Sequence, residues 1–125
     1  MSSTIHEIKI NDGPAVIHRQ PTIGDTFFGR VLSFVEDGAT LDISGDSFSF
    51  QIKDENGAII TGCNLSIGSG IEIFDTNGIE WRIEDTVTAN FTANANWTYR
   101  LKWTRADNGN VKTINAGSVI PRQYP

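Results

Sequence analysis

The most constraining feature of this sequence is a strict alternation of apolar and polar residues in the segment SFSFQIK at 47–53. A period of two predicts a β-strand with one buried side and one side facing solvent. The surrounding stretch, 24–60, is divided by three turn signals, Asp37-Gly38, Ser44-Gly45 and Asn56-Gly57. Because Gly and Asn tolerate the backbone of tight turns, the stretch predicts a nucleus of short strands joined by reversals.

The same design recurs in the second half of the chain. Alternating segments occupy 59–67, 79–84 and 97–104, and turn residues such as Asp107-Asn108-Gly109 separate the later ones. Short strands every eight to twelve residues with turn signals between them are typical of a β-sandwich or barrel, whereas no segment has a helical period. We therefore predict an all-β domain over residues 21–125, preceded by an extended arm or edge hairpin over residues 1–20.

The phase of the alternation also predicts the core. The residues expected to face one another inside the domain are Phe48, Phe50, Ile52, Trp81, Ile83, Trp97, Tyr99 and Leu101. Cys63 falls in the apolar phase of its segment, which favours a small buried hydrophobe. Gly29 interrupts the expected strand at 26–35 and suggests either a bulge or a strand covered on both sides.

Length and charge narrow the possible functions. The chain has 125 residues, the size of one domain, and its 10 Lys and Arg against 15 Asp and Glu give a formal net charge of −5. The cations are scattered along the sequence, which argues against nucleic acid as a partner. No apolar run is long enough to cross a bilayer, and the start MSSTIHEIKI lacks the features of a secretory signal. The expectation is a protein made in the cytoplasm with no membrane partner.

The sequence gives no support for catalysis or for a cofactor. The single cysteine has no cationic or His neighbour in the sequence, and no nucleophile elbow or phosphate loop is present. His6 and His18 alone make a weak metal site, because zinc usually takes three or four protein ligands. The segment 107–110 lacks the alternating ligands and distal Glu of a calcium loop. We expect no enzyme, no cofactor and no metal.

Five segments together resemble a known family. They are Gly24–Phe27 (GDTF), Leu41–Gly45 (LDISG), Phe50–Ile60 (FQIKDENGAII), WTYRLKW at 97–103 and Gly117-x-Val119-x-Pro121. In these segments the chain is similar to the N-terminal immunoglobulin-like domain of phage baseplate upper proteins. The resemblance implies a single immunoglobulin-like antiparallel β-sandwich. It also implies a non-enzymatic structural role in a phage virion, as an adaptor or attachment protein of the tail, baseplate or head-fibre apparatus.

This resemblance further implies where the protein is found and what it contacts. It would be made in the host cytoplasm, reside in the virion, and contact other virion proteins as a homo-oligomer or in several copies. A second interpretation, a small carbohydrate-binding module, depends on the aromatic residues Trp81, Trp97, Tyr99 and Trp103. Exposed and coplanar rings would serve as a sugar platform, but their apolar phase favours core packing.

If the protein is an adaptor, the ends of the chain are the expected contact points. The candidate partner-binding residues are Ile5, Ile8, Ile10 and Ile17 in the arm and Arg122 and Tyr124 in the C-terminal tail. Arg and Tyr are enriched at interface hot spots, and an apolar arm can add to the sheet edge of a neighbour. The alternative is that the arm covers an edge of its own domain and the tail frays.

Overall fold

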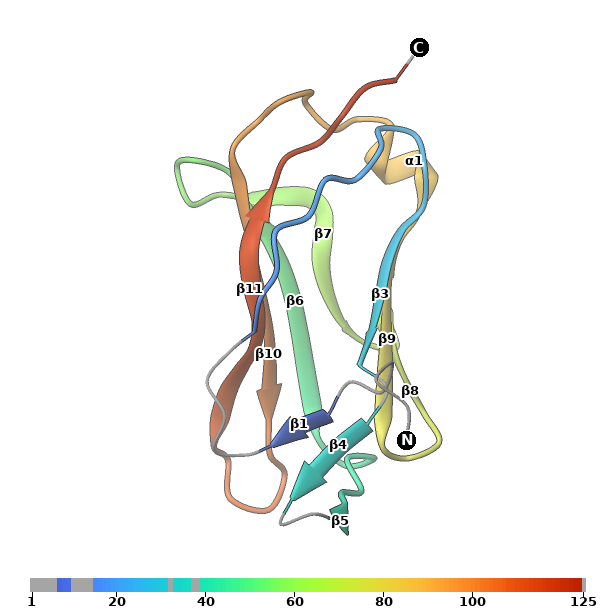
Figure 1. Ribbon diagram of the computed structural model, residues 1–125, viewed down its shortest axis with the longest axis vertical. Helices are drawn as coiled ribbons and strands as arrows, with labels where there is room; N and C mark the ends of the chain where they lie inside the picture. Colours follow the sequence, from blue (N-terminus) through green and yellow to red (C-terminus); the bar gives the residue numbers. More distant parts are fainter. Residues whose placement is uncertain (1–6, 10–14, 32, 37–38, 125) are drawn as a thin grey trace.

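A computed structural model describes residues 7–9, 15–31, 33–36 and 39–124 and shows an all-β fold, which confirms the predicted class (Figure 1). Within the described residues the elements are β1 (Glu7–Lys9), β2 (Ala15–Val16), β3 (Phe27–Val31), β4 (Ser33–Glu36), β5 (Ala39–Thr40), β6 (Ser47–Lys53), β7 (Ile59–Ile67), β8 (Gly70–Phe74), β9 (Gly78–Ile83), α1 (Asp85–Thr88), β10 (Trp97–Thr104) and β11 (Val111–Val119). The one described helix is four residues long, and no helix in the described part of the chain could span a membrane.

One large sheet, curled into two facing layers, makes most of the fold. Its strand order is β2-β11-β10-β6-β7-β8-β9-β3, and β7 curves across from one layer to the other (Figure 1). Gly62 lies in β7 at a φ of 82°, and a Cβ there would approach Val87 Cγ1 to 2.7 Å. The register between β6 and β7 also shifts between Gln51 and Lys53. These irregularities let β7 leave one layer and join the other, because bulges and glycines bend strands.

The alternation in β6 and β10 produces the expected two-sided strands. The two strands are antiparallel neighbours, and the pairs Tyr99–Ile52, Leu101–Phe50 and Trp103–Phe48 place their apolar residues in register. All eight predicted core residues are buried, with exposed fractions of 5% or less. The predicted burial of Cys63 is confirmed as well.

Aromatic rings fill the space between the layers. Trp81 stacks on Phe50 at a centroid distance of 4.2 Å and meets Phe27 edge-on at 5.0 Å. At the other end of the core, Trp103 meets Phe34 edge-on at 4.9 Å. The indole nitrogen of Trp103 donates to Asp46 Oδ2 at 2.7 Å, so its polar atom is satisfied despite burial. Truncating one of these rings to Ala is expected to cost about 3–5 kcal/mol.

A second, small sheet of order β1-β4-β5 lies at one end of the sandwich (Figure 1). At the opposite end, α1 follows β9 and is tied to the turn before β3, because Thr88 Oγ1 donates to the carbonyl oxygen of Asp25 at 2.7 Å. The helix was not expected from the sequence, because four residues are too few to create a helical period.

The pairing adds detail that the prediction did not contain. The prediction was an antiparallel sandwich, and three strand pairs, β1–β4, β2–β11 and β7–β8, are parallel. Gly29 makes no bulge, since β3 pairs with β9 without a register shift. The glycine is needed for a different reason: a Cβ there would lie 2.6 Å from Cζ2 of Trp81, whose ring covers this position.

Candidate functional site

The arm that precedes β3 runs along the outer edge of β11. From β2 onward it is parallel to β11, with Ile17 N–H donating to Ala116 O and Arg19 N–H donating to Ser118 O, both at 2.9 Å. Gly117 permits this approach, because a Cβ there would collide with the carbonyl oxygen of Ile17. From β2 onward the arm therefore covers an edge of its own domain, whereas β1 pairs with β4 in the small sheet.

The predicted partner-binding residues of the arm lie in different parts of the structure. Ile5 and Ile10 lie outside the described residues. Ile8 is in β1, opposite Phe34 of β4. Ile17 is half-buried against β10 and β11, where its carbonyl oxygen accepts a hydrogen bond from the Tyr99 hydroxyl at 2.7 Å. The structure thus places Ile17 in contacts within its own domain.

Arg122 also bonds within the domain, whereas Tyr124 is mostly exposed. The Arg122 Nη1 donates to Asn94 Oδ1 at 2.8 Å, and its backbone N–H donates to Pro21 O at 2.9 Å. Arg122 therefore ties the tail to the arm and to the turn before β10. The side chain of Tyr124 is 63% exposed, so of the two predicted tail residues Tyr124 is the one that a partner could reach.

Arg19 closes the side of the sandwich where the arm lies. Its guanidinium lies 5.2 Å from the ring centroid of Trp81 and 5.4 Å from that of Tyr99. Its Nε donates to the Tyr99 hydroxyl oxygen at 3.2 Å. The contact joins the arm to β9 in one layer and to β10 in the other, through a cation over two aromatic faces.

The aromatic residues on which a sugar site would depend are inside the protein. Trp81, Trp97, Tyr99 and Trp103 are 1%, 5%, 3% and 1% exposed. A carbohydrate platform needs rings that a sugar can stack on from solvent. These four residues therefore support packing and not saccharide binding.

Groups that could perform chemistry are few among the described residues. Burial raises the pKa of the Cys63 thiol from its ordinary value of 9.0 to about 12, which leaves the thiol protonated and unreactive at neutral pH. No group of three or more His, Cys, Asp or Glu able to hold a metal occurs in the described part of the chain. The turn carboxylates bond nearby backbone: Asp54 Oδ1, for example, accepts from Asn56 N at 2.9 Å and Ala58 N at 3.0 Å.

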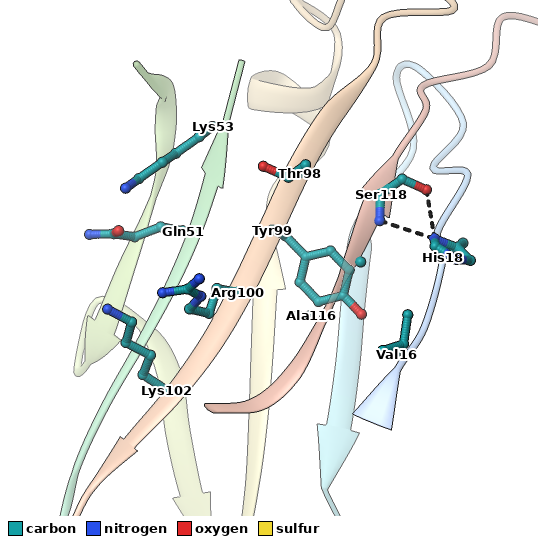
Figure 2. A pocket seen from close by; sticks show the side chains of 11 residues that line it. Val16, His18, Gln51, Lys53, Thr98, Tyr99, Arg100, Lys102, Ala116 and Ser118 are labelled. Carbon is teal, nitrogen blue, oxygen red and sulfur yellow. Dashed lines mark hydrogen bonds between the residues drawn. The ribbon is translucent and has the colours of Figure 1, made fainter. Parts of the chain in front are cut away.

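A groove of about 610 Å³ lies on the outer side of β6, β10 and β11. Figure 2 shows Lys53, Gln51, Arg100 and Lys102 lying together over β6 and β10, with His18 on the arm beyond β11. The described lining residues of this groove include no Asp or Glu. The charged side chains among them are all cationic, in a protein whose net charge is −5.

The far side of the groove carries a hydrogen-bonded histidine (Figure 2). The Ser118 N–H donates to His18 Nδ1 at 3.2 Å, and the Ser118 hydroxyl lies 2.9 Å from the same nitrogen. Because a backbone N–H can only donate, Nδ1 is an acceptor and the ring proton lies on Nε2. The imidazole therefore has an N–H donor that neither of these bonds uses.

The outer side of the opposite layer has a different charge pattern. There, Arg30 Nε lies 2.6 Å from Glu80 Oε2, and Arg82 Nε lies 3.3 Å from Glu84 Oε1. Opposite charges alternate across β3 and β9, so this face has little net charge. The two outer faces are thus distinguished by whether each cation has a carboxylate beside it.

The sequence analysis missed the cationic groove because its residues are far apart in the chain. Lys53 and Arg100 belong to segments more than forty residues apart, and adjacent strands bring them together. A signal was present: both alternating strands carry cations at their polar positions. It becomes visible only once β6 and β10 are known to be neighbours.

No protein-family model and no curated protein matches this chain. The resemblance of its GDTF and LDISG motifs to phage baseplate proteins therefore stays a prediction.

Proposed function

We propose that this protein is a non-enzymatic structural component of a phage virion, an adaptor or attachment protein of the tail, baseplate or head-fibre apparatus. It would reside in the virion in several copies and contact other virion proteins. The five motifs described above support this assignment, and the all-β sandwich agrees with the fold that the resemblance implies.

One observation carries the adaptor role: in the described part of the chain, the edge strand β3 has a neighbouring strand on one side only. The large sheet ends at β3, which pairs with β9 on one side and with no described strand on the other. Phe28 projects from this strand and is 60% exposed. An unpaired edge with an exposed aromatic residue suits an extended segment from another subunit, which would add backbone hydrogen bonds and cover the ring.

The test is the composition of purified particles. Virions of the phage that encodes this chain would be separated on a density gradient and analysed by quantitative mass spectrometry. We expect the chain to comigrate with known tail or head proteins in a fixed ratio to them. Recovery of the chain only in the unassembled fraction, while other virion proteins sediment together, would contradict the proposal.

A matched pair of variants would test whether the β3 edge makes the attachment. Phe28→Thr should reduce incorporation at least tenfold, whereas Val111→Thr, at a residue that is also 60% exposed, should incorporate normally. Equal incorporation of both variants would exclude β3 as the contact while leaving the particle assignment to the gradient experiment.

A further inference from the structure

The cationic groove is built from aligned rows of side chains that cross four segments of the chain. One row runs from Lys53 through Thr98 to Ser118 and His18. The next row contains Gln51, Arg100 and Ala116. The positions on β11, Ala116 and Ser118, are small, which leaves the surface hollow between the long side chains and the arm.

Among the residues that the structure describes, the three cations of this groove have no anionic partner. Lys53 and Arg100 are exposed and Lys102 is half-exposed, and none of them is paired with a described carboxylate. Three like charges repel one another, and an acidic chain could have placed any of its 15 carboxylates beside them. An unneutralised cluster on an otherwise acidic molecule is complementary to an external anion.

The spacing of the cations indicates the form of that anion. Residues two apart on a strand are separated by about 7 Å, so Arg100 and Lys102 lie about that far apart on β10. Lys53, opposite Thr98, is one further step along the same direction. An extended peptide with carboxylates at alternate positions has the same repeat along one of its sides.

The rest of the groove favours a peptide over a nucleic acid or a sugar. Single-stranded nucleic acid is usually held by aromatic side chains that stack on its bases, and sugars need a similar platform. Among the described lining residues the one Phe, Tyr or Trp is Tyr99, which is 3% exposed and directs its hydroxyl to Ile17 O. The Thr98 hydroxyl and the Nε2–H of His18 lie instead along the floor and wall, and these groups can donate to carboxylates.

We propose that the outer face of β6, β10 and β11 is a docking site for an extended acidic segment of a partner protein, bound through Lys53, Arg100 and Lys102. This proposal stands independently of a phage-virion role. The contact is electrostatic and side-chain mediated, because the strands beneath it already have neighbours on both sides. Its affinity should fall steeply as salt increases.

The probe is a fluorescent, end-capped peptide of about eight residues in which Glu and Thr alternate, so that its carboxylates share one side when it is extended. Binding to the full chain would be measured by fluorescence anisotropy at low ionic strength. We expect saturable binding that weakens about tenfold or more between about 50 and about 300 mM NaCl. The same peptide with Gln in place of Glu should not bind.

Matched triple variants separate a local site from the effect of total charge. K53Q/R100Q/K102Q should weaken peptide binding at least tenfold. R30Q/R82Q/K112Q removes the same number of cations outside the groove and should change binding less than about twofold. Circular dichroism would establish that both variants are folded, which is expected because the groove residues are on the surface.

The remaining outcomes decide the proposal. Equal weakening by the two variants, or no binding of the Glu peptide, would overturn it. Binding of a single-stranded oligothymidylate through the same three cations, without binding of the peptide, would overturn it in favour of nucleic acid. Self-association that salt or K53Q/R100Q/K102Q abolishes would support it, with a second copy as the acidic partner.

Discussion

The two edges of the large sheet are covered in different ways. At the β11 edge, the chain adds its own residues 15–22 as a parallel neighbour, and Gly117 gives the backbone of Ile17 room to approach. At the β3 edge, the described residues add no neighbour, and Gly29 accommodates the ring of Trp81 from the adjacent strand. Each edge thus has a glycine at a very close contact. Gly117 makes room for the backbone of the arm, whereas Gly29 makes room for a side chain of the neighbouring strand.

This difference changes where a partner would be expected. Sequence analysis placed partner binding on the arm and tail, including Ile17 and Arg122, whose hydrogen bonds hold the covered edge. Removing either region would therefore disturb the domain as well as any external contact. At the β3 edge, by comparison, the outer backbone groups pair with no described strand, and the ring of Phe28 is exposed. These groups could bind a partner without breaking a described contact of the domain.

Among substitutions at the two edges, the largest effect should come from Gly117→Ala, at the covered edge. The new methyl group would collide with the carbonyl oxygen of Ile17, so the arm must move away from β11 and lose its hydrogen bonds. We expect a loss of about 3 kcal/mol in the free energy of unfolding, measured by denaturant titration with tryptophan fluorescence. Gly45→Ala is the control, because its Cβ would meet only Ala106 Cβ at 3.9 Å and should change stability by less than about 0.5 kcal/mol.

An unchanged stability in Gly117→Ala would mean that the arm contributes little to the domain. In that case the two edges would be equivalent, and the covered one would become a second candidate for docking.

Gly29→Ala should have the next largest effect, at the open edge. A methyl group there must displace the indole of Trp81, which is 1% exposed and stacked on Phe50. We expect a loss of about 1–2 kcal/mol in the same titration, together with a changed fluorescence spectrum of the native state. A larger loss than that of Gly117→Ala would reverse the proposed ranking of the two edges.

Arg19→Met should cost less, about 1 kcal/mol. Methionine keeps apolar contact with Trp81 but lacks the cation over the two rings and the donor to the Tyr99 hydroxyl. The Tyr99 hydroxyl would still donate to Ile17 O, so the arm should stay in place. Thermal unfolding would measure the change, and an Arg19→Lys variant, which keeps the charge, should recover part of it.

The smallest effect on stability should come from Phe28→Thr, at the open edge. The ring is 60% exposed and threonine is a good strand former, so the free energy of unfolding should change by less than about 0.5 kcal/mol. A loss above about 1 kcal/mol would show that Phe28 packs within its own domain. The open edge would then have an internal role, like the covered one.

The sequence predicted the sandwich and its core because alternation is a local signal. In β10, for example, Trp97, Tyr99, Leu101 and Trp103 are every second residue, and burial follows directly from that spacing. The arm's parallel path was not predictable in the same way, because backbone hydrogen bonds such as Ile17 to Ala116 leave no pattern in side-chain types. To predict the cationic groove one must know which strands are neighbours. To predict why Gly29 is needed one must know where the indole ring of Trp81 lies.

The parallel arm has a consequence for the order in which the protein is assembled. His18 bonds to Ser118, one hundred residues later in the chain, so the arm is synthesised first but has no strand to join until β11 exists. Contacts of such long separation form late, since the entropy of closing the intervening loop must be overcome before the contact is made. A nascent chain that stops before residue 111 would lack the strand that receives the arm. The arm from β2 onward is therefore held by a strand that is made about one hundred residues later.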